Sequence, residues 1–186
     1  RGTRTLAASQ LYGNAGNDTI ALGNQLSNLS ASTIGGGAGD DVIGTYTYVN
    51  STLALNKDLD VSAAGGIGTA GSANASFIEA GGGNDSITLA FSSTKLSANT
   101  IGGSQGNDTI ELNLGGTVET RANFIAGGGG ADLMSANLGG TGNTLYGGGG
   151  NDSISLTAEA AFHGNTIGGD TYAAASDWDG DDLITA

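Results

Sequence analysis

Seven aspartates recur at one position of a short glycine-rich segment, and they are the side chains of this chain best suited to chemistry. The segment has the form G-G-x-G-N/D-D-x-I-x. Its copies start at Gly13, Gly36, Ala80, Gly103, Gly127, Gly147 and Asp177. The sixth position is always an acid: Asp18, Asp41, Asp85, Asp108, Asp132, Asp152 and Asp182. Solvated turn residues are the alternative interpretation, but a turn alone does not require the same acid seven times. Recurring carboxylates beside glycine turns indicate binding of a cation that prefers oxygen ligands.

A second pattern predicts the elements that position these acids. Nine residues before six of the aspartates stands Ser or Asn, and an aliphatic residue follows two positions later. The Ser/Asn residues are Ser9, Ser32, Ser76, Asn99, Asn123 and Asn143, and Asn165 precedes the seventh acid at a longer distance. Residues i and i+2 of a strand face the same side. Each unit is therefore expected to be a strand, a glycine turn and a second strand. The Ser/Asn side chains are expected to form an inward hydrogen-bond ladder, unless they only start a turn.

The spacing of the acids predicts an all-β, parallel β-solenoid that spans residues 1–186 as one domain. Successive aspartates lie 23, 44, 23, 24, 20 and 30 residues apart, which fits coils of about 22 residues and about seven or eight coils. The interval of 44 leaves two interpretations open for residues 45–75. They form a degenerate coil, with GGIGTAGSA starting at Gly65, or a long insertion within one coil. The segment from Tyr46 to Leu55 is expected to contain a strand.

The composition narrows the possible partners. The chain has 186 residues with 36 glycines, no proline and no cysteine, and its 18 acidic and 5 basic residues give a net charge of −13. This balance argues against nucleic acid and against anionic membrane surfaces, because both need clustered Lys and Arg. No apolar run approaches the ~20 residues of a membrane span, so no membrane insertion is expected. The chain starts at Arg1 without a recognisable signal peptide, and we expect a mature product or an excised fragment.

The nine-residue segments closely resemble the glycine- and aspartate-rich repeats of RTX (hemolysin-type) calcium-binding proteins. The resemblance runs from about Ser9 to Thr185 and implies a β-roll that binds Ca²⁺ between successive turns. This chain has one glycine turn per coil, so a single row of sites is expected rather than two. By this resemblance the ligands are the seven aspartates and the first-, third- and fifth-position residues. These are Gly13, Ala15, Asn17, Gly36, Ala38, Asp40, Gly82, Asn84, Gly103, Gln105, Asn107, Gly127, Gly129, Ala131, Gly147, Gly149, Asn151, Asp177, Asp179 and Asp181.

Electrostatics and the thin interior both predict that folding depends on cations. Carboxylates stacked ~5 Å apart repel by about 3 kcal/mol per pair at an effective dielectric of about 20. Up to about six Ca²⁺ ions would add about +12 and nearly cancel the net charge of −13. Two aliphatic residues per coil contribute roughly 3–6 kcal/mol, less than the cost of ordering the coil. We therefore expect calcium binding and folding to be coupled.

Several functions are compatible with such a solenoid. We expect an extracellular or cell-surface structural protein, a filament, sheath or S-layer-like building block that associates head to tail. The alternative is an RTX segment of a larger secreted adhesin or toxin that folds on calcium binding after export. An ice-binding surface is less favoured, because Val42, Leu133 and Leu183 interrupt the small polar row of Thr19, Ser86, Thr109 and Ser153.

No enzymatic activity is expected. Gly102–Gly106 matches G-x-S-x-G and Gly66–Gly71 matches G-x-G-x-x-G, but neither has the strand–turn–helix context that these motifs need. His163 is the only histidine and has no sequence link to Ser104. The cluster Asp177, Asp179, Asp181 and Asp182 is interpreted as a modified calcium turn rather than an EF-hand, because the twelfth-position acid is missing.

Overall fold

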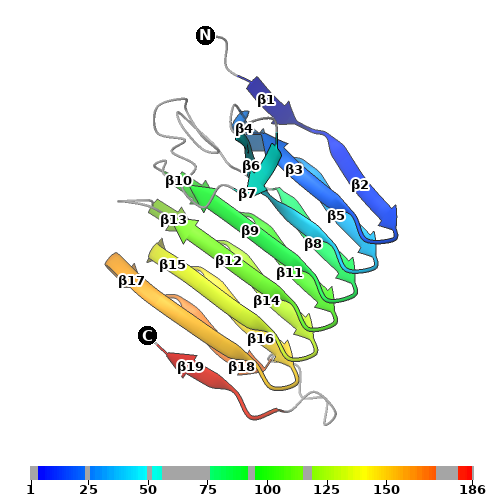
Figure 1. The fold of residues 1–186 in the computed structure, drawn as a ribbon. Coiled ribbons are helices and arrows are strands. Elements are labelled where there is room, and N and C mark those ends of the chain that lie inside the picture. The colour runs from blue at the N-terminus through cyan, green and yellow to red at the C-terminus, as the bar shows by residue number, and fades with distance from the viewer. Residues whose placement is uncertain are drawn as a thin grey trace.

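The described part of the computed structural model comprises residues 4–23, 26–49, 52–55, 76–91, 95–114, 119–170 and 180–185, and it consists of strands and turns without a helix. Accordingly, no helical segment there could cross a membrane. Two parallel sheets form the long walls of one solenoid (Figure 1). Each coil crosses the first sheet, turns at the glycine segment and returns in the second sheet. We call these the pre-turn sheet and the post-turn sheet.

The pre-turn sheet has seven strands, one per coil, in the order β18-β16-β14-β11-β8-β5-β2. Their bounds are β2 (Gln10–Ala15), β5 (Thr33–Ala38), β8 (Phe77–Gly82), β11 (Thr100–Gln105), β14 (Phe124–Gly129), β16 (Thr144–Gly149) and β18 (Thr166–Asp170). The post-turn strands of the same coils are β3 (Thr19–Gly23), β6 (Val42–Val49), β9 (Ser86–Phe91), β12 (Thr109–Leu114), β15 (Leu133–Thr141), β17 (Ser153–His163) and β19 (Leu183–Thr185). The expected all-β parallel solenoid is confirmed, and the described residues form seven coils.

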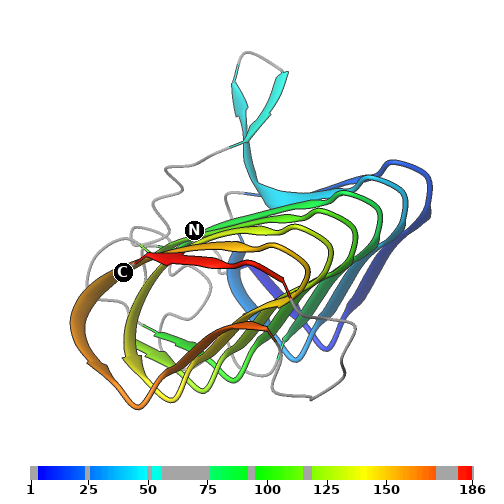
Figure 2. The same ribbon diagram turned by 90° about the horizontal axis from the view of Figure 1, so that it is seen from below.

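Short strands line the third side of the coil, opposite the glycine turns (Figure 2). Their bounds are β1 (Arg4–Ala7), β4 (Leu26–Ser30), β10 (Lys95–Ser97) and β13 (Glu119–Arg121). Strand β1 pairs with β4, and β10 pairs with β13, which pairs with the far end of β15. This side carries the connections whose length varies from coil to coil.

The core is built from ladders of aliphatic side chains that follow the predicted alternation. In the pre-turn sheet, Ile34, Ile78, Ile101 and Ile125 lie in one register column, and each is at most 3% exposed. The post-turn sheet supplies a first column, which includes Ile43, Ile87, Ile110, Met134 and Ile154, and a second column with Leu89 and Leu112. A one-residue slip would turn all of these side chains outward, so burial fixes the register.

The interval of 44 residues between Asp41 and Asp85 is one coil with an insertion. Strand β5 pairs directly with β8, and β6 pairs directly with β9, so no coil lies between them. The end of β6 forms an antiparallel hairpin with β7 (Thr52–Leu55), which projects from the solenoid (Figure 2). A strand between Tyr46 and Leu55 is thereby confirmed. The GGIGTAGSA segment lies outside the described residues.

The predicted Ser/Asn ladder forms at the corner that leads into the pre-turn sheet. The Asn99 amide N–H and Nδ2 donate to Asn123 Oδ1 at 3.1 and 3.0 Å, and Asn123 repeats both bonds to Asn143 Oδ1 at 3.2 and 2.9 Å. Asn99, Asn123 and Asn143 are at most 4% exposed. In the six coils where the structure describes it, the residue before the ladder position has a positive φ: Ala8, Ala31, Ala98, Ala122, Gly142 and Gly164. This left-handed corner residue was not predicted from the sequence, and it is Ala or Gly in these six coils.

Candidate metal centre

The glycine turns stack in a single row along the edge where the pre-turn and post-turn sheets meet (Figure 1). The fourth-position glycine is required because coils approach closely there. Gly130 has a φ of 135°, and a Cβ built on it would lie under 3.0 Å from the carbonyl oxygen of Gly106 in the preceding coil. Only glycine combines this φ with so short an approach. The glycines therefore allow the turns to stack one rung apart, at about 4.8 Å.

The sixth-position aspartates lie directly above one another along this edge. In each case the Oδ1 atom accepts a hydrogen bond from the amide N–H of the aspartate in the preceding coil. Asp18 N–H donates to Asp41 Oδ1 at 2.8 Å, and Asp41 N–H donates to Asp85 Oδ1 at 2.6 Å. The ladder continues at 2.8 Å in each step through Asp108, Asp132, Asp152 and Asp182. The in-register stack of all seven acids, on which the calcium prediction rests, is present.

The second carboxylate oxygen of this ladder is buried and has no hydrogen-bond partner. This holds for Oδ2 of Asp18, Asp41, Asp85, Asp108, Asp132 and Asp152. Asp41, Asp85, Asp108, Asp132 and Asp152 are at most 3% exposed. Burying an ionised oxygen without a partner is costly unless a cation or a proton neutralises it. Six such atoms in one row therefore define the candidate site.

A main-chain carbonyl of the next coil faces five of the six unpartnered oxygens across a first-position glycine, and in the turn of Asp85 that position is held by Ala80. A Cβ built on Gly13 would lie 2.6 Å from Asp18 Oδ2 and 2.5 Å from the carbonyl oxygen of Gly36. The same two kinds of oxygen would contact a Cβ on Gly36, Gly103, Gly127 and Gly147. Glycine therefore allows a carboxylate oxygen and a carbonyl oxygen to approach the main chain closely at the same point. Ca²⁺ prefers these two ligand types, at distances of about 2.3–2.6 Å.

The carboxyl groups are held in an environment that disfavours their charge. Burial raises the pKa of Asp108 to about 7, and hydrogen bonding from the Asp85 amide only partly opposes this rise. The neighbouring charges of Asp132 and Asp85 raise the pKa further. Burial raises the pKa of Asp152 to about 6, and it also raises those of Asp85 and Asp132. A bound cation would counteract these shifts, because an opposite charge nearby favours the ionised carboxylate.

The third- and fifth-position residues have other bonds in this structure. The third-position carbonyls of Ala38, Gly82, Gln105, Gly129 and Gly149 accept the fourth-position N–H of the preceding coil at 2.6–2.9 Å. At the fifth position an exposed ladder forms, in which Asn107 N–H donates to Asn84 Oδ1 and Ala131 N–H donates to Asn107 Oδ1, both at 2.8 Å. Asn17, Asp40, Asn151 and Asp181 belong to the same ladder. Calcium ligation by third- and fifth-position carbonyls, that of Ala15 included, stays a prediction.

The last turn is assembled differently from the expectation. The register pairs Tyr146 with Gly168 and Gly148 with Asp170, so the first position is held by Gly169 and not by Asp177. A Cβ on Gly169 would contact Asp182 Oδ2, as at the other first positions. The first part of the motif is thus separated from Gly180, Asp181 and Asp182 by an insertion. Asp177 and Asp179 lie outside the described residues, and their part in binding stays a prediction.

Two first-position residues were missing from the predicted ligands, and the sequence contains the signal for both. The carbonyl oxygens of Ala80 and Gly169 face the unpartnered oxygens of Asp41 and Asp152. Each residue stands four positions after its Ser/Asn ladder residue, Ser76 and Asn165, as in every other coil. Counting from the ladder would have identified Gly169, whereas Ala80 already stood at the first position of its copy and was left out of the predicted ligands.

The donor set limits which ion can bind. Within the described ranges, no three acidic, histidine or cysteine side chains gather around one point. A cation in this row would therefore be held by carboxylate oxygens, one per turn, together with main-chain carbonyls and water. Such an all-oxygen set suits Ca²⁺ and does not suit ions that prefer nitrogen or sulfur. The residues present fit calcium.

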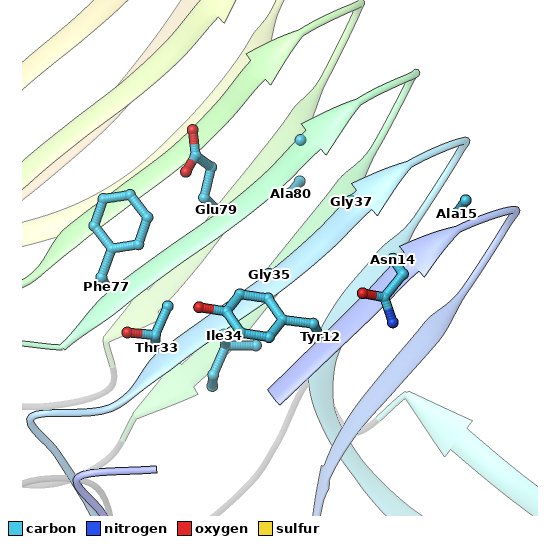
Figure 3. A pocket seen from close by; sticks show the side chains of 11 residues that line it. Tyr12, Asn14, Ala15, Thr33, Ile34, Gly35, Gly37, Phe77, Glu79 and Ala80 are labelled. Carbon is cyan, nitrogen blue, oxygen red and sulfur yellow. The ribbon is translucent and has the colours of Figure 1, made fainter. Parts of the chain in front are cut away.

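Other polar features of the described surface are separate from this row. Ser104 Oγ donates to Glu79 Oε1 at 2.6 Å, and His163 is an exposed residue of β17. A hollow on the outer face of the pre-turn sheet lies between Tyr12 and Phe77, where β5 contributes Gly35 (Figure 3). Its labelled polar side chains come from Asn14, Thr33 and Glu79 (Figure 3). Gly66–Gly71 falls outside the described residues.

Comparison with known protein families agrees with this geometry. The family described as RTX calcium-binding nonapeptide repeat (4 copies) matches residues 8–25, 70–90, 96–116, 119–141 and 138–158. These ranges include five of the aspartates, and together they span more than half of the chain. Searches of curated proteins and of solved structures found no match. The chain belongs to the RTX calcium-binding nonapeptide repeat family.

Proposed function

We propose that the chain is a calcium-stabilised, extracellular structural repeat protein that serves as a building block of a filament, sheath or surface layer. Membership in a calcium-binding repeat family supports calcium as the ion, and such repeat proteins are generally secreted. The observation that carries the proposal is the row of six buried aspartate Oδ2 atoms without partners. At five of the six, a first-position glycine lets the carboxylate and a carbonyl oxygen of the next coil approach the same point.

Calcium has a structural role in this proposal. The aspartate Oδ1 atoms already link successive coils, because each accepts a hydrogen bond from a main-chain N–H of the preceding coil. The Oδ2 atoms oppose folding when they are ionised, because they are buried next to one another. An ion bound between turns replaces this repulsion by attraction and links each coil to the next. Binding and folding are then one process, as in other small domains whose metal sites are absent from the unfolded chain.

Circular dichroism in calcium and in excess chelator tests this coupling. We expect a β spectrum at neutral pH in calcium and a largely disordered spectrum in chelator, and restored calcium should restore the β spectrum. Mg²⁺ at the same concentration is the control, because it demands octahedral geometry and gives up its water reluctantly. A β spectrum and melting temperature unchanged by chelation would contradict the proposal.

Head-to-tail association would require the two end coils of the solenoid to fit one another. Core-column residues are partly uncovered there: Leu11 is 41% exposed at one end and Ile184 is 44% exposed at the other. A second copy stacked in the same register would place its Ile20 over Ile184 and its Asp18 over Asp182. Open edges of parallel sheets favour such pairing with another chain. The contact would continue both the core and the aspartate row.

Sedimentation velocity and electron microscopy in calcium test the association. We expect rods longer than one chain, and Ile184→Glu should shorten them to monomers without changing the β spectrum. Leu133→Glu is the matched control, because Leu133 is 52% exposed on a coil away from the ends. Only folded monomers in calcium would refute the polymer. That result would favour the alternative, a segment of a larger secreted adhesin or toxin in which further coils cover the same ends.

The remaining functions have less support. The outward post-turn column pairs Thr109 with Leu133 and Ser153 with Leu183, and the two leucines are 52% and 61% exposed. These exposed apolar side chains break the regular polar row that an ice-binding face needs, and absence of thermal hysteresis is the expected result. We also propose that the chain is not an enzyme, since cation binding accounts for its buried acids.

A further inference from the structure

Ala80 is the only first-position residue in the described turns that carries a side chain. The register places Glu79 beside Gly102 and Gly81 beside Ser104, so Ala80 lies opposite the first-position Gly103. The other first positions are occupied by Gly13, Gly36, Gly103, Gly127, Gly147 and Gly169. Ala80 is fully buried, with 0% exposure. Its methyl group therefore lies inside the solenoid, within the row of turns.

The backbone of Ala80 follows the same path as the glycines. A Cβ built on Gly36 would meet the Ala80 carbonyl oxygen and Asp41 Oδ2. In the same way, a Cβ built on Gly103 would meet the Gly127 carbonyl oxygen and Asp108 Oδ2. A Cβ at the first position therefore projects toward the aspartate of its own turn and the carbonyl of the next coil. For Ala80 these two oxygens are Asp85 Oδ2 and the carbonyl oxygen of Gly103.

We propose that the Ala80 methyl closes the cation position between the third and fourth coils, so that the calcium row consists of two separate runs. This inference rests on the proposed binding of calcium by the aspartate row. An ion that bridges Oδ2 and the carbonyl must lie about 2.3–2.6 Å from both. A Cβ built at a first-position glycine would lie under 3.0 Å from the same two kinds of atom, so a methyl group there forces its neighbours to shift. The Ala80 methyl therefore crowds the approach of an ion to these two oxygens.

Asp85 keeps its structural role without an ion. Its Oδ1 accepts the Asp41 amide at 2.6 Å, and its own amide donates to Asp108 Oδ1 at 2.8 Å. The hydrogen-bond ladder is thus continuous through the third coil, whereas the ion row is interrupted. Two inter-coil positions remain on one side, at Asp18 and Asp41, and three on the other, at Asp108, Asp132 and Asp152. The interruption falls in the coil that directly follows the long insertion.

Calcium counting on the full-length chain and two variants tests the interruption. Bound calcium is measured by equilibrium dialysis with elemental analysis at saturating calcium, and folding is verified by circular dichroism in the same buffer. Ala80→Gly removes the methyl, and we expect it to bind one ion more than the wild type. Gly127→Ala places the same methyl in an open position, and we expect it to bind one ion fewer. The difference between variants is the readout, so ions bound elsewhere on the acidic surface cancel.

The outcomes separate this inference from the proposed function. A wild-type chain that binds no calcium overturns both. A wild-type chain that binds calcium, with the same count in Ala80→Gly, overturns the closed position and leaves the proposed function standing. An additional ion in Ala80→Gly supports the closed position, and it does so even where Gly127→Ala fails to fold.

Discussion

Asp108→Asn is expected to have opposite effects with and without calcium. The asparagine Oδ1 can still accept the hydrogen bond that Asp108 takes from the Asp85 amide. Its Nδ2 group replaces the unpartnered Oδ2 and can donate to the Gly127 carbonyl, which faces that space. The variant therefore removes a buried negative charge and a calcium ligand together. It should stabilise the calcium-free chain and weaken the calcium-bound one.

The magnitude follows from the pKa of Asp108. Burial raises this pKa from 3.8 to about 7 in the folded chain. A carboxyl with a raised pKa stabilises the folded state at low pH, and this stabilisation is lost as the pH rises through the folded-state pKa. At about 1.36 kcal/mol per pH unit, the loss by pH 8 is at most about 4 kcal/mol, and solvent screening reduces it. Asp108→Asn abolishes this loss, so in chelator it should gain up to that amount at pH 8 and less than half of it at pH 5, and the gain should vanish only below the unfolded pKa of 3.8.

Circular dichroism at pH 5, 6, 7 and 8 measures the folded fraction in chelator, and urea unfolding at the same pH values measures stability in calcium. In calcium at pH 8 the variant should bind one ion fewer and unfold at lower urea than the wild type. Asp40→Asn is the matched control, because it removes the same charge from an exposed position of a turn and preserves an oxygen for the Asn84 amide. If Asp108→Asn is less stable than the wild type in chelator at pH 8, the buried carboxylate does not oppose folding and the reasoning is wrong.

Three further measurements address the rest of the fold. In chelator, the wild-type chain should lose β structure as the pH rises through about 6 to 7, because Asp152 and Asp108 ionise there. Calcium should abolish this pH dependence. A circular dichroism spectrum in chelator that does not change with pH would contradict the prediction. Gly128→Ala should lower the free energy of unfolding by about 3 kcal/mol or more in chemical unfolding, because residue 128 has a φ of 126° and a new Cβ would contact the Ser104 backbone. Gly16→Ala should cost only about 1–2 kcal/mol, because residue 16 has a φ of 104° but nothing lies within 4 Å of a new Cβ. Asn123→Ala should cost about 3 kcal/mol or more, because it removes the acceptor of two hydrogen bonds from buried donors of Asn99. The exposed Asn107→Ala should cost no more than about 1 kcal/mol. Equal losses would show that burial of the ladder does not matter.

The sequence was sufficient to predict those features that repeat in every coil. A recurring aspartate, an aliphatic two residues later and a Ser/Asn nine residues earlier are local patterns, and stacking turns each of them into a ladder. Asp108 and Asn123 were placed correctly for this reason. The same logic predicted that Ile110 faces the core, because one face of a strand must be buried in any solenoid of this type.

The features that the sequence did not determine depend on contacts between coils. Whether residues 45–75 form a coil depends on the direct pairing of β5 with β8, which no local pattern reveals. The role of Gly169 was obscured because an insertion splits the last turn, so that counting back from Asp182 gives Asp177; its register with Gly147 shows the correct position. The use of Asp Oδ1 for main-chain N–H groups was also missed. It follows from the orientation of the carboxylates in the stacked turns, and sequence spacing carries no such information.

The connections opposite the glycine turns have a consequence for how this protein can change. The stacked aspartates fix the register of the coils along one edge. On the opposite side, the segments that connect one coil to the next differ widely in length, and the coils still pair directly. Insertions and deletions on that side leave the neighbouring coils in place. Evolution can therefore vary those loops independently of the scaffold, and foreign peptides grafted there would be displayed at spacings set by whole rungs of the solenoid.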